Sequence, residues 1–165
     1  MKKFFTLITI VMALGILTGC GSSKSVGAAT TNVKQETPAT ARGDVKMLGT
    51  KNKITVDDKV LTATLEDNAA TKALVKKMPM TLKMENLYER EMCYRYGQGG
   101  LPTDKLRNDG YQIGDIAYWP PRGSLVILYA QNGERFERQQ IGHIDGSVAF
   151  FAAAGGKDIT FELAK

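Results

Sequence analysis

The sequence predicts a mainly β domain, built as a barrel or a sandwich, and three observations support this fold class. Short runs in which apolar and polar residues alternate recur from residue 53 to the end of the chain, and such alternation is typical of half-buried strands. Turn-forming residues separate these runs at short intervals. The chain of 165 residues is 43% apolar and 24% charged, which is the composition of a globular protein. A closed barrel would also leave no exposed strand edges.

The first strands form a predicted hairpin, and a helix follows them. Residues 53–56 and 60–65 alternate on either side of an Asp-Asp pair, which favours a tight turn. Asn68 can cap a helix over residues 69–78, because its side chain can accept a hydrogen bond from the first turn. A proline directly after residue 78 ends this helix.

More strands follow in the second half of the chain. Asn132-Gly133 is a strong hairpin signal, and it predicts that residues 135–139 return alongside residues 124–129. The strands predicted in this part are residues 80–85, 90–96, 115–119, 124–129, 135–139 and 158–163.

A second helix is predicted near the end of the chain. Asp145 or Ser147 can cap it, and it runs through Ala154 to a Gly-Gly pair that ends it. The whole domain then has about eight strands and two short α-helices.

The first twenty residues have the pattern of a bacterial lipoprotein signal. Two lysines precede an apolar stretch over residues 4–17, which is shorter than a membrane-spanning helix requires. Residues 17–20, Leu-Thr-Gly-Cys, resemble the lipobox, in which the signal is cut before the Cys. We therefore expect a signal peptide at residues 1–19 and a lipid on Cys20, with acyl chains such as palmitate that anchor the protein to a membrane of the cell envelope, outside the cytoplasm. The alternative is an ordinary signal peptide followed by a Cys without a lipid.

The predicted domain is nearly neutral, although the whole chain has a formal net charge of +5. Residues 20–44 are small and polar and show no apolar periodicity, so they are predicted to be a flexible tether. Without the signal the net charge is +3, and residues 45–165, the predicted domain, carry +2. This charge gives no support to nucleic-acid binding.

Several kinds of catalytic or metal site are excluded by the residues present. One His and two Cys are too few for the four Cys and His ligands of a structural zinc site, so no metal is expected. The Gly-rich segment at residues 97–100 fits neither common phosphate-binding fingerprint, and no cofactor is expected. His143 is interpreted as a structural or surface residue, with an acid–base role as the alternative. Cys93 is interpreted as a buried apolar thiol, with a reactive thiol as the alternative.

The segment from Arg90 to Gln98 carries the strongest candidate site. In an extended strand, alternate residues share one face, and here that face holds Arg90, Met92, Tyr94, Tyr96 and Gln98. These side chains could line an apolar pocket with a few directed donors. In the alternative interpretation, Met92 and Tyr94 face the core, and Arg90 and Gln98 mark its solvated ends.

The order of these motifs resembles that of a known family. The matching pieces are Thr71-Lys72-Ala73-Leu74, Arg90 with Gln98-Gly99-Gly100 eight residues later, Gly114-Asp115-Ile116-Ala117-Tyr118, Gly123-Ser124-Leu125-Val126-Ile127 and Ile141-Gly142-His143-Ile144-Asp145-Gly146. In this order they resemble the bacterial cyclophilin-like domains over about residues 53–163. The resemblance implies a closed cyclophilin-like β-barrel.

The resemblance also implies where a ligand would bind. In cyclophilins an Arg donates to the prolyl nitrogen of a peptide, and Arg90 takes that position here, with Gln98 at the position of the family's amide. The pocket Phe and Met of the family fall at Arg95 and Tyr96, and residues 132–140 contain neither the expected Trp nor the expected His.

We therefore expect a monomeric binding module for a peptide segment or a small ligand. Its expected contact residues are Arg90, Tyr96, Gln98 and Trp119, with Tyr118 in place of Trp119 if the strand is shifted by one residue. The alternatives are a peptidyl-prolyl isomerase that uses Arg90, and an accessory to flavin or redox proteins.

Overall fold

The computed structural model describes residues 49–165. The predicted signal peptide at 1–19, the lipid site at Cys20, the predicted tether at 20–44 and the first four residues of the predicted domain lie outside the described residues.

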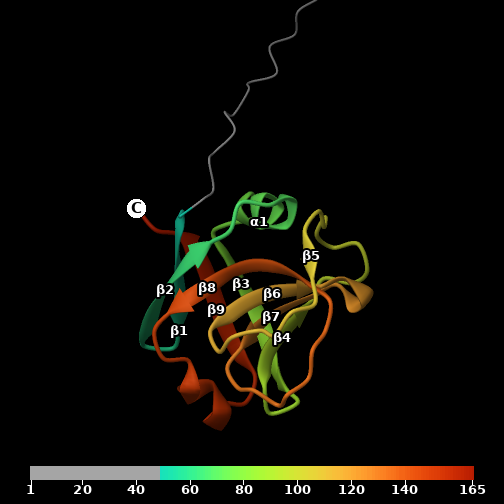
Figure 1. The fold of residues 1–165 in the computed structure, drawn as a ribbon. Helices are drawn as coiled ribbons and strands as arrows, with labels where there is room; N and C mark the ends of the chain where they lie inside the picture. Colours follow the sequence, from blue (N-terminus) through green and yellow to red (C-terminus); the bar gives the residue numbers. More distant parts are fainter. Residues whose placement is uncertain (1–48) are drawn as a thin grey trace, which may run out of the picture. The chain divides into compact units, whose positions relative to one another are not determined.

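The described residues form a closed antiparallel β-barrel with one α-helix (Figure 1). Eight strands make the ring in the order β2-β1-β9-β3-β4-β7-β6-β8, a pairing of β2 with β8 closes it, and β5 is added at the edge of β8. The elements are β1 (Lys51–Val56), β2 (Lys59–Leu65), α1 (Ala69–Val75), β3 (Met80–Leu87), β4 (Glu91–Arg95), β5 (Leu106–Arg107), β6 (Asp115–Trp119), the 3-10 helix η1 (Pro120–Arg122), β7 (Ser124–Leu128), β8 (Arg138–Asp145), the 3-10 helix η2 (Ala149–Ala153) and β9 (Lys157–Leu163). This architecture confirms the predicted fold class.

The first hairpin and the helix cap agree with the sequence prediction. β1 and β2 pair with Val56 opposite Lys59, which leaves a two-residue Asp-Asp turn between them. The Asn68 side chain accepts a hydrogen bond from the backbone N–H of Thr71 at 2.9 Å. The helix α1 ends at Val75, three residues before the predicted end, because the next turn tightens to i→i+3 hydrogen bonds.

The predicted hairpin at Asn132-Gly133 is wrong. Strand β7 pairs with β4 and β6, and β6 lies between β7 and β8. Residues 129–137 therefore form a loop instead of a tight turn, and β8 begins at Arg138. The Asn132 side chain stabilises this loop, because its Oδ1 accepts hydrogen bonds from the Glu134 backbone N–H and from the Tyr111 hydroxyl.

The second predicted α-helix is a 3-10 helix of five residues, η2. Its hydrogen bonds span three residues, from Phe151 N–H to the Val148 carbonyl and from Ala154 N–H to the Phe151 carbonyl. Asp145 does not cap it. Asp145 ends strand β8, where its carboxylate accepts a hydrogen bond from Lys51 Nζ at 2.6 Å.

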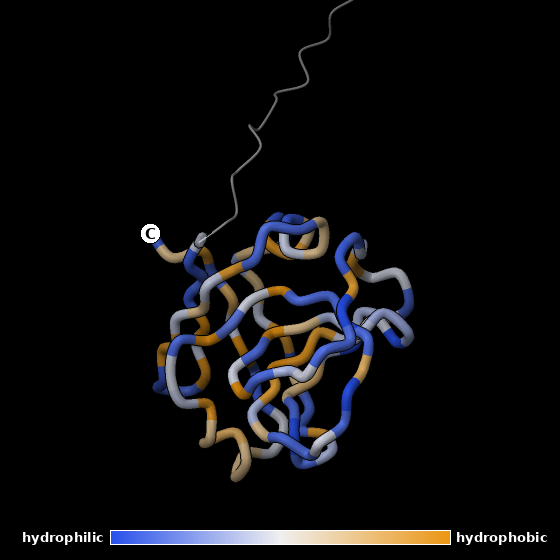
Figure 2. Tube along the Cα trace, in the orientation of Figure 1, coloured by the Kyte–Doolittle hydropathy of each residue, from blue (hydrophilic) through white to orange (hydrophobic). Residues whose placement is uncertain are grey.

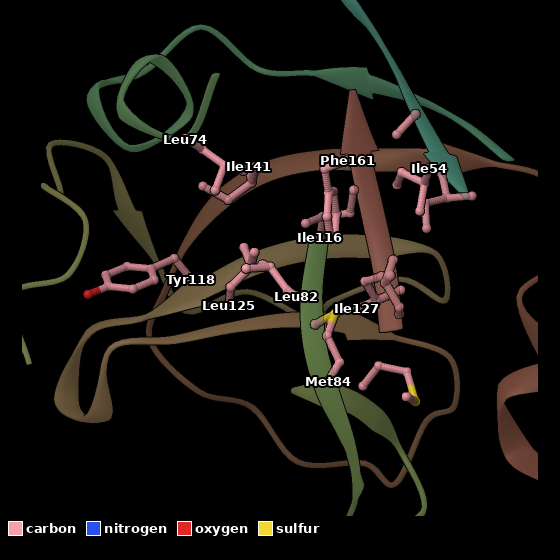
Figure 3. Packing of buried hydrophobic residues seen from close by; sticks show 14 of the residues in the cluster. Ile54, Leu74, Leu82, Met84, Ile116, Tyr118, Leu125, Ile127, Ile141 and Phe161 are labelled. Atoms are coloured by element: carbon pink, nitrogen blue, oxygen red, sulfur yellow. The ribbon is translucent and has the colours of Figure 1, made fainter. Parts of the chain in front are cut away.

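The barrel interior is filled by the inward-facing residues of the strands (Figure 3). Leu74 of α1 lies over Ile141 of β8, so the helix covers one end of the interior, and the Tyr118 ring lies at one side of the cluster with its hydroxyl directed away. Orange segments in Figure 2 follow the strands, whereas most turns and connecting loops are blue.

The barrel closes where β8 meets β2, and this contact requires a glycine. Gly142 lies opposite Leu65 in the β2–β8 ladder. A Cβ atom at position 142 would lie 2.5 Å from the Thr64 carbonyl oxygen, which is inside van der Waals contact. The two backbones can approach this closely because Gly142 has no side chain.

A second, smaller apolar layer lies on the outer face of the barrel over β4, β7 and β6. In the ladders, Val126 of β7 lies between Cys93 of β4 and Ala117 of β6. Tyr111 and Phe136, from the two loops on either side of β6 and β7 in the chain, pack on this face. Cys93 is buried here, as predicted. These loops build the walls of the candidate site.

Within residues 49–165, no helix has the length and hydropathy that a membrane crossing requires.

Candidate functional site

Arg90 lies in the turn between β3 and β4, directly before β4 begins. Tyr88 and Glu89 both have positive φ, at 58° and 50°, and this left-handed backbone makes the turn tight. The Arg90 N–H donates to the Leu87 carbonyl, and the Arg90 carbonyl accepts from the N–H groups of Tyr129 and Ala130. The backbone of Arg90 is therefore fixed from both sides.

The Arg90 guanidinium is held by two carboxylates of different character. Its Nε and Nη2 donate to Oε2 of Glu91 at 3.2 and 3.0 Å. Its Nη1 donates to Glu134 at 2.8 Å and to the Asn132 side-chain oxygen at 3.4 Å. The side chains of Arg90 and Glu91 are 10% and 7% exposed, whereas that of Glu134 is 68% exposed. A buried Arg–Glu pair is thus extended toward solvent by a second carboxylate.

Aromatic rings surround the same guanidinium. The Arg90 Cζ atom lies 5.3 Å from the centre of the Phe136 ring, 5.8 Å from that of Tyr88 and 5.9 Å from that of Tyr111. These distances fall within the range of cation–π contacts. The rings shield the charge from water, so the hydrogen bonds to Glu91 are made in an environment of low polarity.

A cavity of about 300 Å³ opens beside Arg90 on the outer face of the barrel. Its size is at the lower end of small-molecule sites. Its lining is Tyr88, Arg90, Glu91, Trp119, Val126, Asn132, Glu134 and Phe136. We call this space the Arg90 cavity. It combines apolar walls with one buried ion pair, so it can accept a small apolar group and direct a hydrogen bond to a polar atom beside that group.

Burial changes the pKa of the Glu91 carboxyl. It raises the pKa of the Glu91 carboxyl above its ordinary value, and the neighbouring Arg90 charge opposes this shift without cancelling it. The negative charge of the Glu91 carboxylate is therefore compensated by the positive charge of Arg90.

Comparison with known proteins identifies the family. The sequence profile of the cyclophilin-like family matches residues 54–162. The chain belongs to the cyclophilin-like family. A hypothetical protein of Archaeoglobus fulgidus, solved in solution, is similar in fold, with a TM-score of 0.54 and 15% sequence identity over 73% of this chain and 98% of that one. No curated protein matches the chain.

The cyclophilin-like barrel places the predicted contact residues on three different surfaces. Arg90 and Trp119 line the Arg90 cavity. Gln98 and Tyr118 line a separate, shallow cavity of about 320 Å³ near Pro120 and Pro121. Trp119 and Tyr118 are consecutive residues of β6, so their side chains point to opposite faces of the sheet, with Tyr118 in the barrel core. Arg90 and Gln98 lie beyond opposite ends of β4, whose five residues span roughly 17 Å of extended chain.

Tyr96 lines neither of these two cavities. Its ring packs against the barrel core and makes an edge contact with the Tyr94 ring at 4.9 Å. Its hydroxyl donates to the Met80 sulfur at 3.6 Å, and burial raises its pKa to about 12. Met92 and Tyr94 also face the core, which agrees with the alternative interpretation of this segment. Arg90 differs from that interpretation, because it is buried in ion pairs and is not a solvated end.

The sequence reasoning missed Glu91, Glu134 and Phe136 as parts of the site. Glu91 follows Arg90 directly, and in a strand two consecutive side chains would point to opposite faces. They meet because Arg90 belongs to the turn. Glu134 and Phe136 come from the loop that was predicted to be a hairpin, so no pattern in the chain indicated that they would reach β4.

A polar cluster with His143 lies on a different part of the barrel. His143 Nδ1 is 3.0 Å from Asp115 Oδ1, and both line a cavity of about 250 Å³ with Arg107, Asp109 and other polar residues. In the described part of the chain, no three His, Cys, Asp or Glu side chains are placed to hold a metal ion. This arrangement is compatible with the structural or surface role predicted for His143.

Proposed function

We propose that this protein is a lipid-anchored binding module of the cell envelope, which presents the Arg90 cavity to a peptide segment or a small ligand. The domain is a member of the cyclophilin-like family. The lipid anchor is inferred from the residues around Cys20 alone.

One observation carries the binding proposal: the Arg90 guanidinium is already engaged. A guanidinium has five N–H groups, and four hydrogen bonds to Glu91, Glu134 and Asn132 account for four of them. Among the residues that the structure describes, none accepts a hydrogen bond from the second N–H of Nη2. This N–H is therefore available to a ligand. A ligand can bind with one such hydrogen bond and apolar contacts, and it need not be activated.

The same observation weighs against the isomerase alternative. In cyclophilins the Arg must follow the prolyl nitrogen as the amide twists, and the barrier to this rotation is about 18–20 kcal/mol. A guanidinium fixed by two carboxylates has its positive charge compensated before the peptide arrives. It can therefore stabilise the twisted amide less than a free guanidinium could.

The apolar walls decide which part of the ligand enters. Phe136 and Val126 provide an apolar surface, and Trp119 lies beside them. A space of about 300 Å³ accommodates a proline ring or one aromatic or branched side chain, with the rest of a peptide outside. We therefore assign the cavity to a single residue of a longer segment, or to a ligand of similar size.

The binding proposal can be tested directly because Trp119 is the single Trp of the chain. The experiment titrates acetyl-Ala-Ala-Pro-Phe, as the acid and as the amide, into the protein and follows Trp fluorescence. We expect a saturable change, and about tenfold weaker binding in Phe136→Ala. Phe150→Ala is the matched control, because Phe150 is also half-buried but lies in η2, away from the cavity.

Two results would contradict the proposal. One is the absence of a saturable change with either peptide, and the other is equal binding by wild type and Phe136→Ala. The exchange rate of the Ala-Pro bond, measured by NMR on the same samples, tests the alternative. Faster exchange in wild type that Arg90→Lys abolishes would support an isomerase, and an unchanged rate is the result we expect.

A further inference from the structure

We propose that the Arg90 cavity selects ligands that carry a carboxylate, and that Glu134 is an internal competitor which occupies the carboxylate position until such a ligand displaces it. This inference rests on the proposed binding function. It adds the chemical class of the ligand and a residue that controls access.

The two carboxylates on Arg90 differ in how firmly they are held. Glu91 is in strand β4, is 7% exposed and accepts two hydrogen bonds from the guanidinium. Glu134 comes from a loop, is 68% exposed and accepts one hydrogen bond, at 2.8 Å. Water competes for the exposed Glu134 carboxylate, so its ion pair with Arg90 is weaker than the buried pair with Glu91. Glu134 can therefore leave the guanidinium at little cost, whereas Glu91 cannot.

The departure of Glu134 would not disturb the loop. The Glu134 backbone N–H donates to the Asn132 side-chain oxygen, and that oxygen also accepts from Arg90 and Tyr111. The backbone is thus fixed independently of the Glu134 carboxylate. Rotation of one exposed side chain is enough to free the Nη1 donor of Arg90.

Charge balance determines what can take the vacated position. With Glu134 bound, Arg90 faces two negative groups; once it leaves, Arg90 faces Glu91 alone. A ligand carboxylate restores the original arrangement, whereas a neutral amide provides only a weaker hydrogen bond. A ligand carboxylate that entered without displacing Glu134 would place three negative groups around one guanidinium.

The cavity walls define the rest of the ligand. The vacated position borders Phe136, which lies 5.3 Å from Arg90 Cζ, and the cavity continues to Val126 and Trp119. An aromatic or aliphatic carboxylic acid fits this combination. It could come from the C-terminal residue of a peptide or from a free organic acid, because both present the same apolar group beside a carboxylate.

The experiment compares acids with their amides in two proteins. The probes are 3-phenylpropionate, 3-phenylpropionamide, and acetyl-Ala-Ala-Pro-Phe as the acid and as the amide, each titrated with Trp119 fluorescence as the readout. We expect the acids to bind more tightly than the amides. Glu134→Gln should tighten acid binding about two- to fivefold and change amide binding by a smaller factor. The stronger of the two acids identifies the source of the carboxylate, a peptide terminus or a small molecule.

Glu137→Gln is the matched control. Glu137 is an exposed acid of the same loop, but it lines the cavity beside Gln98 instead of the Arg90 cavity. Its substitution removes the same charge and should leave all four affinities unchanged. If it strengthens acid binding as much as Glu134→Gln does, the effect is general repulsion and the competitor role is overturned.

The remaining outcomes separate this inference from the proposed function. Equal binding of acids and amides, or acid binding that Glu134→Gln does not change, overturns the carboxylate assignment and leaves a binding cavity. Failure of all four probes to change the fluorescence overturns the binding function and this inference together.

Discussion

Arg90 and Glu91 are consecutive residues, yet their side chains form a buried ion pair on the outer face of the barrel, with two hydrogen bonds at 3.2 and 3.0 Å. Consecutive residues of one strand could not do this, since their side chains alternate between faces. The pair exists because the chain changes from turn to strand between them. The stability of this ion pair therefore depends on the backbone conformation of the turn as well as on the side chains of the site.

We predict that loss of the Arg90 charge is costly for folding. Arg90→Met leaves the Glu91 carboxylate buried without its main partner and should lower the free energy of unfolding by about 3–5 kcal/mol. Replacement of both residues, as Arg90→Met with Glu91→Leu, should recover most of this loss, because no buried charge remains. Urea denaturation measures both effects.

The control for this prediction is Arg95→Met. Arg95 pairs with Glu85 at 3.5 Å, and both side chains are exposed, so the expected cost is below about 1 kcal/mol. A cost for Arg90→Met as small as that for Arg95→Met would contradict the buried pair.

A second prediction concerns acid stability and Asp109. The Arg107 guanidinium donates to the Asp109 carboxylate and lowers the pKa of this group to about 2. A lowered pKa means that the folded protein favours the ionised form, so its contribution to stability is present above pH 4 and is lost as the pH falls toward 2. Wild type should therefore lose its advantage in Tm over Asp109→Asn across this window.

Thermal melts between pH 2 and pH 6 test this expectation. Arg107→Gln should flatten the same part of the profile, because it removes the cause of the lowered pKa. A difference in Tm between wild type and Asp109→Asn that stays constant down to pH 2 would show that Asp109 does not titrate in this way.

A third prediction concerns the closure of the barrel. Gly142→Ala places a Cβ atom 2.5 Å from the Thr64 carbonyl oxygen, so β2 and β8 must separate. We expect a loss of about 1–3 kcal/mol in the free energy of unfolding. Gly155→Ala is the control, since a Cβ atom there meets no atom within 4 Å. Equal stability of the two variants would contradict the close approach of β2 and β8.

How much of the fold and of the site could be predicted from the sequence depends on how far apart in the chain the interacting residues are. The β1–β2 hairpin and the Asn68 cap depend on residues that are close in the chain, and both were predicted correctly. The loop after β7 could not be predicted, because the Asn132 side chain bonds to Tyr111 and Arg90, which are far away in the sequence. Glu134 and Phe136 were missed in the prediction of the site for the same reason, because they are far from Arg90 in the sequence.

Trp119 and Gln98 illustrate the limit for the site itself. Both were predicted as ligand contacts, but only the strand order decides which face of the barrel each one reaches. Trp119 shares the outer face of β6 with Ala117 and lines the Arg90 cavity, whereas Gln98 lies beyond the far end of β4. Spacing along the chain does not contain this information.

A fourth prediction concerns the lipid anchor. If residues 17–20 are a lipobox, Cys20→Ser removes the thiol that carries the lipid, and the protein should move from the membrane fraction to the soluble fraction. Cys93→Ser is the control, because Cys93 is buried in the domain. Membrane retention of Cys20→Ser would contradict the predicted anchor.

The most direct test of the account is a map of amide chemical shifts on addition of acetyl-Ala-Ala-Pro-Phe as the acid. We predict that the shifted amides cluster around Arg90, Val126, Glu134 and Phe136, and that those around Gln98 and Tyr118 stay unchanged. Shifts centred on Gln98 and Tyr118, or an unperturbed spectrum at saturating peptide, would contradict the assignment of the Arg90 cavity as the binding site.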